Sequence, residues 1–139
     1  MDQDCLFCKI VAGEIPSYKI FEDDDFMAIT DIQPVNLGHA LLIPKAHYKN
    51  LFDLPDRLLG GLGVHLQKLA LAIKTATAAD GINLGMNNET AAGQLIFHAH
   101  FHIIPRFTGD GFEHWHGQTK PTPEDLTAIT EKIKSNFTK

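Results

Sequence analysis

The feature that most constrains this sequence is a short segment, residues 98–104, in which histidines alternate with apolar residues. In an extended strand, successive side chains point to opposite faces, and neighbours on one face lie roughly 6–7 Å apart. The alternation therefore predicts a strand with three imidazoles on one face and a buried apolar face behind them. The histidines are His98, His100 and His102, and the apolar residues between and after them are Ala99, Phe101 and Ile103.

Three imidazoles on one strand face suit two kinds of chemistry. They could bind a metal ion, or they could line a phosphate pocket in which one ring is the nucleophile, because a neutral imidazole is a competent nucleophile at cellular pH. A strand that carries histidines without a function is the weaker interpretation, since histidine is not a favoured strand residue. The segment therefore indicates a functional site.

Charge and hydropathy patterning exclude several classes of protein. The chain has 12 Lys and Arg against 17 Asp and Glu, a net charge of −5, which disfavours broad binding of nucleic acid. A local pocket for a small anion remains compatible with this charge. No apolar run reaches the roughly 18–20 residues that span a bilayer, and the acidic start of the chain lacks signal-peptide character. We expect a cytoplasmic protein that binds neither nucleic acid nor membranes.

The rest of the chain predicts one α+β domain over residues 1–139. Besides the histidine segment, short strands are expected at residues 19–22, 26–31, 40–44 and 82–87. The order of strands and helices favours a single sheet with helices on one face.

Two helices are expected. One runs from Pro55, a residue tolerated at the first helical position, to about Ala78. The other begins at the N-cap Thr122 and lies near the C-terminus. The apolar face of the long helix comprises Leu58, Leu62, Leu66, Leu69 and Ile73, and that of the C-terminal helix comprises Leu126, Ile129, Ile133 and Phe137.

The two cysteines, Cys5 and Cys8, form a CxxC pair. Such a pair can be half of a zinc site, a redox pair or two unrelated thiols. No thioredoxin-like context accompanies it, which disfavours the redox reading. Zinc needs four ligands, and His47 and His98 are the best candidates for the other two. In the alternative reading the thiols stay reduced and His47 only caps a helix.

Residues near the histidine segment could assist phosphate chemistry. If His98 is a metal ligand, His100 and His102 stay available for attack on phosphorus and for donation to a phosphate oxygen. Gly93 lets the backbone approach a phosphate closely, and Gln94 adds an amide side chain beside it. Asn87 can donate a hydrogen bond to a bridging or leaving oxygen.

The pattern Gly93-Gln94-x-x-x-His98-x-His100-x-His102-Ile103-Ile104 resembles the signature of the histidine triad (HIT) superfamily of nucleotide hydrolases and transferases. Further blocks fall in that family's order, and the resemblance reaches from residue 5 to Arg106. These blocks are residues 5–16, Asp31-Ile32, Gly38-His39, Ile43-Pro44-Lys45-Ala46-His47 and Asn87.

The resemblance implies an antiparallel sheet with a long helix, and a homodimer in which the two sheets are continuous. It implies that His100 attacks the α-phosphate of a purine nucleotide to give a nucleotidyl-histidine intermediate. Phe7, Ile10, Ile29 and Ile32 match positions that line the base and ribose pocket, and Asp31 matches the carboxylate that binds the ribose hydroxyls. His39, Asn87, Gly93, Gln94 and His102 match positions on the phosphate side. Zinc-bearing members support Cys5, Cys8, His47 and His98 as the ligands of a structural Zn²⁺.

Two positions indicate which branch of the family this sequence resembles most. His102 stands where members that transfer nucleotides to sugar phosphates carry glutamine, which favours a hydrolase. Leu95 stands where phosphoramidate hydrolases often carry a serine near the leaving group, so dinucleoside polyphosphates stay open as substrates beside phosphoramidates. The alternatives are a nucleotide-sensing module with little turnover and a zinc-dependent hydrolase.

Overall fold

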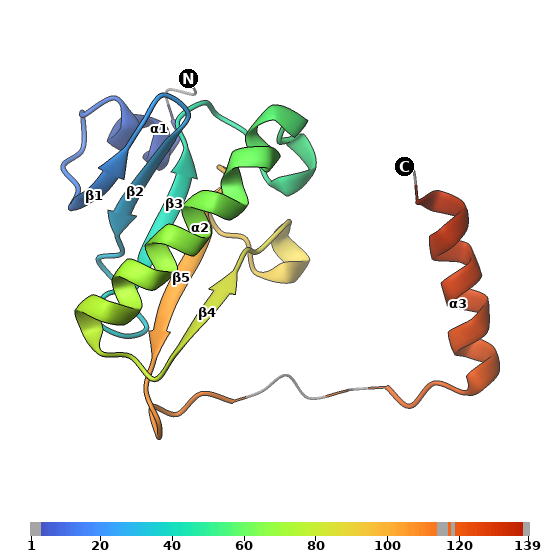
Figure 1. Ribbon diagram of the computed structural model, residues 1–139. Helices are drawn as coiled ribbons and strands as arrows, with labels where there is room; N and C mark the ends of the chain where they lie inside the picture. The colour runs from blue at the N-terminus through green and yellow to red at the C-terminus, as the bar shows by residue number, and fades with distance from the viewer. Residues whose placement is uncertain (1–3, 114–116, 118, 138–139) are drawn as a thin grey trace.

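The computed structural model describes residues 4–113, 117 and 119–137. Its centre is a five-stranded antiparallel sheet in the order β1-β2-β3-β5-β4 (Figure 1). The strands are β1 (Lys19–Glu22), β2 (Phe26–Thr30), β3 (Ala40–Pro44), β4 (Gly81–Gly85) and β5 (Phe101–Arg106). The helices are α1 (Leu6–Val11), α2 (Asp56–Thr77) and α3 (Pro123–Asn136), with short 3₁₀ turns η1 (Leu51–Asp53) and η2 (Thr90–Ala92). The α+β class and the antiparallel sheet predicted from the sequence are confirmed.

The long helix α2 covers one face of the sheet (Figure 1). It buries the side chains predicted for its inner face, except that Leu66 is only partly buried. Each fully buried leucine or isoleucine contributes roughly 1.5–3 kcal/mol relative to an exposed one. The helix ends at Thr77 because Ala78 adopts a left-handed conformation with φ of 52°.

The short helix α1 packs on the opposite face of the sheet, so the expectation of helices on one face only was wrong. Phe7 of α1 contacts a second core cluster that includes Met27, Ile29, Leu41 and Ile43. These residues alternate along β2 and β3 with those that face α2, which is why both strands are buried on both sides. Helix α1 has no periodic signal in the sequence because its six residues are fewer than two helical turns.

The histidine segment enters the sheet later than expected. Strand β5 begins at Phe101, so only His102 of the three histidines lies within it. Upstream of β5, one backbone bond ties the segment to the chain after β3, with the Ala99 N–H donating to the Tyr48 carbonyl at 2.6 Å. The side-chain alternation nevertheless holds, since Ala99, Phe101 and Ile103 lie in the core beneath α2.

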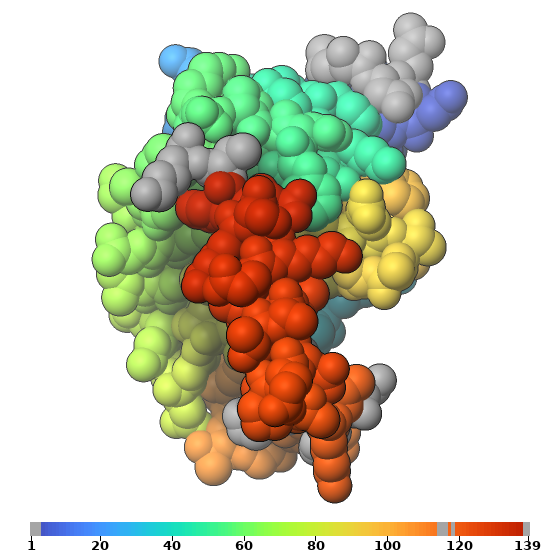
Figure 2. All heavy atoms as spheres, turned by 90° about the vertical axis from the view of Figure 1, so that its right-hand side faces the viewer, coloured from blue at the N-terminus to red at the C-terminus, as the bar shows by residue number. Residues whose placement is uncertain are grey.

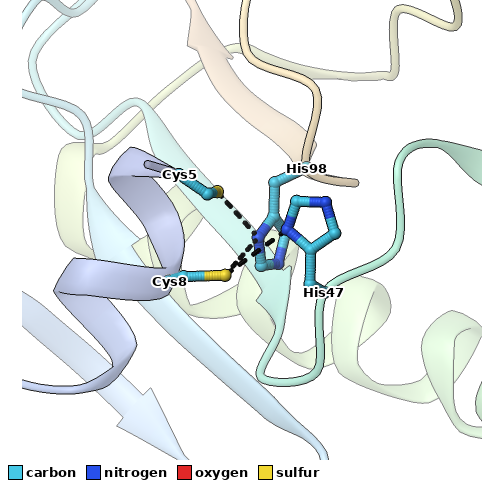
Figure 3. A group of neighbouring side chains, drawn as sticks. All are labelled: Cys5, Cys8, His47 and His98. Carbon is cyan, nitrogen blue, oxygen red and sulfur yellow. Dashed lines mark hydrogen bonds between the residues drawn. The ribbon is translucent and has the colours of Figure 1, made fainter. Parts of the chain in front are cut away.

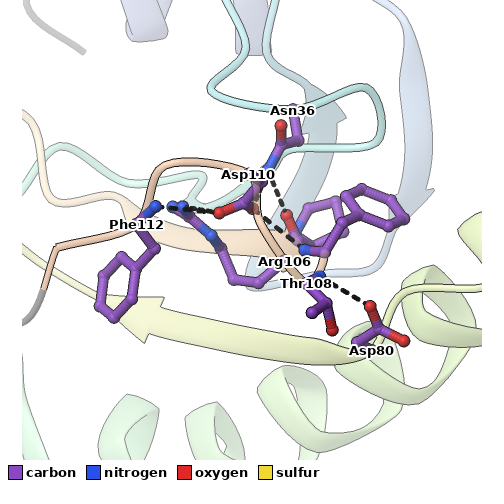
Figure 4. A network of polar contacts seen from close by, with 8 residues as sticks. Asn36, Asp80, Arg106, Thr108, Asp110 and Phe112 are labelled. Carbon is purple, nitrogen blue, oxygen red and sulfur yellow. Dashed lines mark hydrogen bonds and ion pairs between the residues drawn. The ribbon is translucent and has the colours of Figure 1, made fainter.

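A polar network holds the turn that follows β5 (Figure 4). The Asp110 carboxylate accepts from the Arg106 guanidinium at 2.6 Å and from the Asn36 side-chain amide at 2.8 Å. These donors, the Arg106 contact foremost, hold the pKa of Asp110 far below its usual range. On the other side of the turn, the Thr108 N–H donates to Asp80 at 2.7 Å. The network fixes the point at which the chain leaves the sheet.

Beyond this turn, α3 stands apart from the sheet domain (Figure 1). Its N-terminus carries the expected N-cap at Thr122, which also forms a capping box with Asp125, since each side chain bonds the other's backbone N–H. Its apolar face is exposed along its whole length, and this face lies at Leu126, Ile129, Ile133 and Phe137. None of the helices in the described ranges combines the length and apolarity that a bilayer span requires.

Candidate functional site

A cavity of about 460 Å³ opens between α1, the ends of β2 and β5, and the loop that follows β4. This volume lies in the usual range for small-molecule sites. The residues around it belong to segments far apart in the sequence. Of the residues predicted for catalysis and substrate binding, the lining comprises Phe7, Ile10, Ile29, Asp31, Ile32, Asn87, Gly93, His100 and His102.

His100 is held in one orientation by the main chain. Its Nδ1–H donates to the backbone carbonyl of His98 at 2.7 Å, which leaves the lone pair of the neutral ring on Nε2. The Phe7 ring packs against it with a centroid separation of 5.0 Å. Burial lowers the pKa of His100, and the bond to His98 only partly opposes this shift. A neutral ring with a defined tautomer is the form that a nucleophile needs.

His102 presents a hydrogen-bond donor, in contrast to the lone pair on Nε2 of His100. The Val35 N–H donates to Nδ1 of His39 at 3.2 Å, so the proton of a neutral His39 ring is on Nε2. His39 Nε2 then donates to His102 Nδ1 at 2.9 Å, which places the His102 proton on Nε2. Burial and the neighbouring His100 and His39 rings lower the pKa of His102 to about 4. His102 is therefore a neutral donor, 5.0 Å between ring centroids from His100.

His39 is buried and does not line the cavity. It lies behind His102, with Nδ1 3.6 Å from Asp31 Oδ2. Burial lowers the pKa of His39, although the Asp31 carboxylate acts in the other direction. The structure thus places His39 in contact with a cavity residue and not with the cavity itself.

The amide of Gln94 points into the protein. Gln94 is 2% exposed, and it does not line the cavity. Its Oε1 accepts from the Glu89 N–H at 2.8 Å, and its Nε2 donates to the carbonyls of Lys49 and Ile96. These bonds account for its polar atoms and tie the loop after β4 to the segment after β3. The structure therefore gives Gln94 contacts to the main chain only.

Gly93 and Asn87 form the part of the wall next to Gln94. Gly93 has a φ of 88°, a conformation that residues with a Cβ rarely adopt. The Asn87 side-chain amide donates to the Gly93 carbonyl at 3.3 Å. A Cβ added at Gly93 would lie 3.4 Å from this amide nitrogen, so glycine keeps the wall open at this point.

The sequence did not point to the residues of the α1 side that also line the cavity. They include Leu6, Ile15, Pro16 and Ser17, together with Thr30, Gln33, Leu41 and Ile96 elsewhere on the wall. None of these side chains is titratable, and the sequence assigned none of them a role in the site. To predict the lining residues on the α1 side, one would need to know that residues 6–11 form a helix that packs on the sheet.

Cys5, Cys8, His47 and His98 converge on one point beside the cavity (Figure 3). Nδ1 of His98 lies 3.3 Å from Cys5 Sγ and 3.6 Å from Cys8 Sγ, and Nδ1 of His47 lies 3.4 Å from Cys8 Sγ. Ligand atoms of a tetrahedral zinc site with sulfur and nitrogen donors stand roughly 3.5 Å apart. Nε2–H of His98 donates to the Pro44 carbonyl at 2.8 Å, the outer contact typical of a metal-bound imidazole. The residues present fit a zinc ion.

The chain is similar to several known proteins along most of its length. A family model described as HIT domain matches residues 12–109. The chain is 42% identical over 134 residues to Protein hit of Bacillus subtilis, covering 94% of this chain and 92% of that protein. It is 45% identical over 106 residues to Adenylylsulfatase HINT3 of Arabidopsis thaliana, with 76% and 54% covered. It is 43% identical over 106 residues to Adenosine 5'-monophosphoramidase HNT1 of Saccharomyces cerevisiae, with 76% and 65% covered.

Solved structures share the fold. SMU.412c from Streptococcus mutans superposes with a TM-score of 0.91 at 43% identity, over 98% of this chain and 87% of that one. A zinc-bound histidine triad family protein from Mycobacterium smegmatis superposes with a TM-score of 0.75 at 36% identity, over 96% and 98%. With the family model matching most of the chain and these relatives matching nearly all of it, the protein belongs to the HIT domain family.

Proposed function

We propose that this protein is a nucleotide hydrolase that cleaves purine nucleoside phosphoramidates or dinucleoside polyphosphates at the α-phosphate. The observation that carries the proposal is the pair of neutral rings in one cavity, His100 with a lone pair on Nε2 and His102 with a proton on Nε2. The names of two relatives, an adenylylsulfatase and an adenosine 5'-monophosphoramidase, support an adenosine nucleotide as substrate.

In the first step, Nε2 of His100 attacks the α-phosphorus and forms a P–N bond. The bond from phosphorus to the leaving group breaks, and its electron pair stays on the leaving nitrogen or oxygen, which takes a proton from solvent at the cavity mouth when it is basic. In the second step, a water oxygen attacks phosphorus, the P–N bond returns its electrons to Nε2, and the water proton goes to solvent. The products are a nucleoside monophosphate and the free leaving group.

His102 stabilises the charge that develops on phosphorus. Its Nε2–H donates to a non-bridging phosphate oxygen, and this donor costs no reorganisation because His39 already fixes its tautomer. Gln94 acts through the loop that it anchors, so its part in catalysis is to position Gly93 and Asn87.

The nucleoside binds at the α1 side of the cavity. Phe7, Ile10, Ile29 and Ile32 offer apolar contacts to a purine, which do not distinguish adenine from guanine. The Asp31 carboxylate, which lies at the end of β2, binds the ribose hydroxyls.

A Zn²⁺ ion held by Cys5, Cys8, His47 and His98 would be structural, since four protein ligands leave no position for a reacting water. Bound there, such an ion would join α1 to the segment that carries His100. The zinc-bound relative supports this assignment.

Homodimerisation is also proposed. Its support is the apolar face of α3, which the chain's own domain leaves uncovered; in Figure 2 the helix stands in front of the domain, nearest the viewer. The cytoplasmic location stays a prediction from the sequence.

Hydrolysis of an adenosine phosphoramidate and of diadenosine tetraphosphate, measured beside the zinc content of wild type and His100→Asn, tests the function. We expect adenosine monophosphate from the wild type, none from the variant, and the same zinc content in both. Loss of zinc together with activity would favour a zinc-dependent hydrolase, and no product from the wild type would favour a nucleotide sensor.

A further inference from the structure

The two cysteines differ in how far solvent reaches them. Cys5 is partly buried and packs at the margin of the second core cluster, whereas Cys8 is only 2% exposed. His47, whose Nδ1 lies 3.4 Å from Cys8 Sγ, is also only partly buried. A small molecule that approaches from solvent therefore meets the Cys5 thiol before it meets the Cys8 thiol.

The two thiols are close enough to bond to each other (Figure 3). Both Sγ atoms belong to a group of ligand atoms that all lie within 4.8 Å of one another. Cys5 is the N-cap of α1, and Cys8 lies one turn further along the helix. Cα atoms three positions apart in a helix are roughly 5 Å apart, a separation that a disulfide can span. Bond formation would need rotation of the two side chains and no movement of the helix backbone.

Helix α1 connects this pair of thiols to the cavity. Phe7, which stands between the cysteines in the sequence, packs against the His98 ring at 5.9 Å and against the His100 ring at 5.0 Å between centroids. Phe7 and Ile10 of the same helix line the cavity. A change in the bonding of the two cysteines would therefore act on the wall that faces the nucleoside.

We propose that Cys5 and Cys8 are an oxidation site, at which a hydroperoxide converts the two thiolates to a disulfide and releases the zinc ion. This inference goes beyond the proposed hydrolase activity and rests only on the zinc site proposed with it. Cys5 is the thiol that reacts with the peroxide, and Cys8 is the neighbouring thiol that resolves the product. Zinc needs thiolates and four ligands, so His47 and His98 alone are too few to hold the ion once the disulfide has formed.

The oxidation balances with the peroxide as its only co-reactant. The Cys5 thiolate attacks a peroxide oxygen, the O–O bond breaks, and the departing oxygen takes a proton from solvent, which leaves a sulfenic acid on Cys5. The Cys8 thiolate then attacks the Cys5 sulfur, the S–O bond breaks, and the hydroxide takes a proton and leaves as water. The two thiolates lose two electrons in total, and hydrogen peroxide is reduced to two molecules of water. Because the chain has only two cysteines, an intramolecular disulfide must pair them.

Oxidation should loosen the wall of the cavity beside α1. It removes the metal link from α1 to His47 and His98, and it leaves only apolar packing to hold Phe7 against His100. The oxidised protein should therefore bind adenosine monophosphate more weakly than the reduced protein. Reduction in the presence of zinc should restore the affinity.

The test uses zinc-loaded wild-type protein and hydrogen peroxide. Zinc release is followed with a chromogenic chelator, and free thiols are counted with a thiol reagent. Trypsin cuts after Lys9 and so releases both cysteines in one peptide, residues 1–9, whose mass is measured without reduction. The control variant is Cys5→His, which keeps a nitrogen ligand for zinc and leaves Cys8 without a thiol to pair with.

We expect peroxide to release all of the zinc, to consume both thiols, and to leave the peptide lighter by two hydrogen atoms. A thiol reductant added with zinc should reverse each change, and Cys5→His should keep its zinc at the same peroxide dose. Zinc retained by the oxidised wild type, zinc lost without the intramolecular disulfide, or equal release from Cys5→His would overturn the inference. If Cys5→His does not fold, the wild-type measurements of zinc and peptide mass decide alone.

Two further outcomes separate this inference from the proposed function. A protein that hydrolyses no nucleotide leaves the test intact, because the zinc and thiol measurements do not depend on turnover. A protein that takes up no zinc would overturn the inference together with the zinc site, whether or not it hydrolyses nucleotides. Equal affinity for adenosine monophosphate before and after full oxidation, measured by calorimetry, would overturn the effect on the cavity.

Discussion

Nδ1 of His100 donates to the backbone carbonyl of His98 at 2.7 Å, and the ring of His98 in turn faces the two cysteines. One residue thus contributes its side chain to the candidate metal site and its main chain to the orientation of the nucleophile. The candidate metal site and the cavity wall share no residue, and His98 connects them.

Removal of a zinc ligand is expected to cost stability first. Cys5→Ser should release the zinc and lower Tm by several degrees, because binding free energy in a structural site is folding free energy. Thermal melts with and without a chelator, and zinc counted by mass spectrometry, measure this. The activity per folded molecule should fall less than the thermal stability does. An equal loss of both would argue against a purely structural ion.

His39 is expected to act through His102. His39→Ala removes the donor that fixes the His102 tautomer, so kcat should fall about tenfold to a hundredfold with a smaller change in KM. Nitrogen chemical shifts of the His102 ring report the tautomer directly and should show a mixture in the variant. An unchanged His102 tautomer, even with reduced activity, would show that His39 has only a packing role.

Stability is expected to fall with acid because of His102. Its pKa is lowered to about 4 in the folded protein from the ordinary histidine value of 6.5, so the unfolded chain binds more protons between these values. This contribution is fully present above pH 6.5 and is lost as the pH falls toward about 4. Urea unfolding of zinc-saturated protein across this range should give a smaller slope for His102→Asn than for the wild type. Equal slopes would mean that the folded protein does not lower the pKa of His102.

Gln94→Ala is expected to destabilise the fold strongly although no charge is lost. It leaves the Glu89 N–H and the Lys49 carbonyl without their partner at partly buried positions, at up to roughly 1–3 kcal/mol for each group. Urea unfolding measures the change. Exposed Leu71→Ala serves as the matched control on α2. A change below 1 kcal/mol would contradict the role of Gln94 as the anchor of the loop.

The apolar face of α3 is expected to carry the dimer contact. Replacing Ile129 and Ile133 together by serine should shift sedimentation from dimer to monomer, because both side chains are exposed in the single chain. The pair should not change the helix itself, since neither residue is buried within its own domain. A dimer that persists would contradict this contact and favour the continuous sheet between protomers that the family resemblance implies.

Much of the fold followed from local patterns, and the exceptions have physical reasons. The alternation of His100, Phe101 and His102 was enough to place both rings on the cavity wall. The start of β5 could not be read from it, because it depends on where the partner β3 ends its pairing at Leu42. The direction of the Gln94 amide was equally hidden, since its main acceptor, the Lys49 carbonyl, lies 45 residues away in the sequence. Helix α1 depends on packing of Phe7 against the sheet and not on its own periodicity.

The central claim is that His100 bonds transiently to phosphorus. Protein quenched in acid-free denaturant during turnover of an adenosine phosphoramidate, digested and analysed by mass spectrometry, tests it most directly. We predict one adenylyl group on the peptide that contains His100, located on that residue by fragmentation and absent from His100→Asn. An adenylyl group on another residue would contradict the claim. So would turnover without any protein-bound nucleotide, provided that the slower His39→Ala variant, quenched in the same way, also shows none.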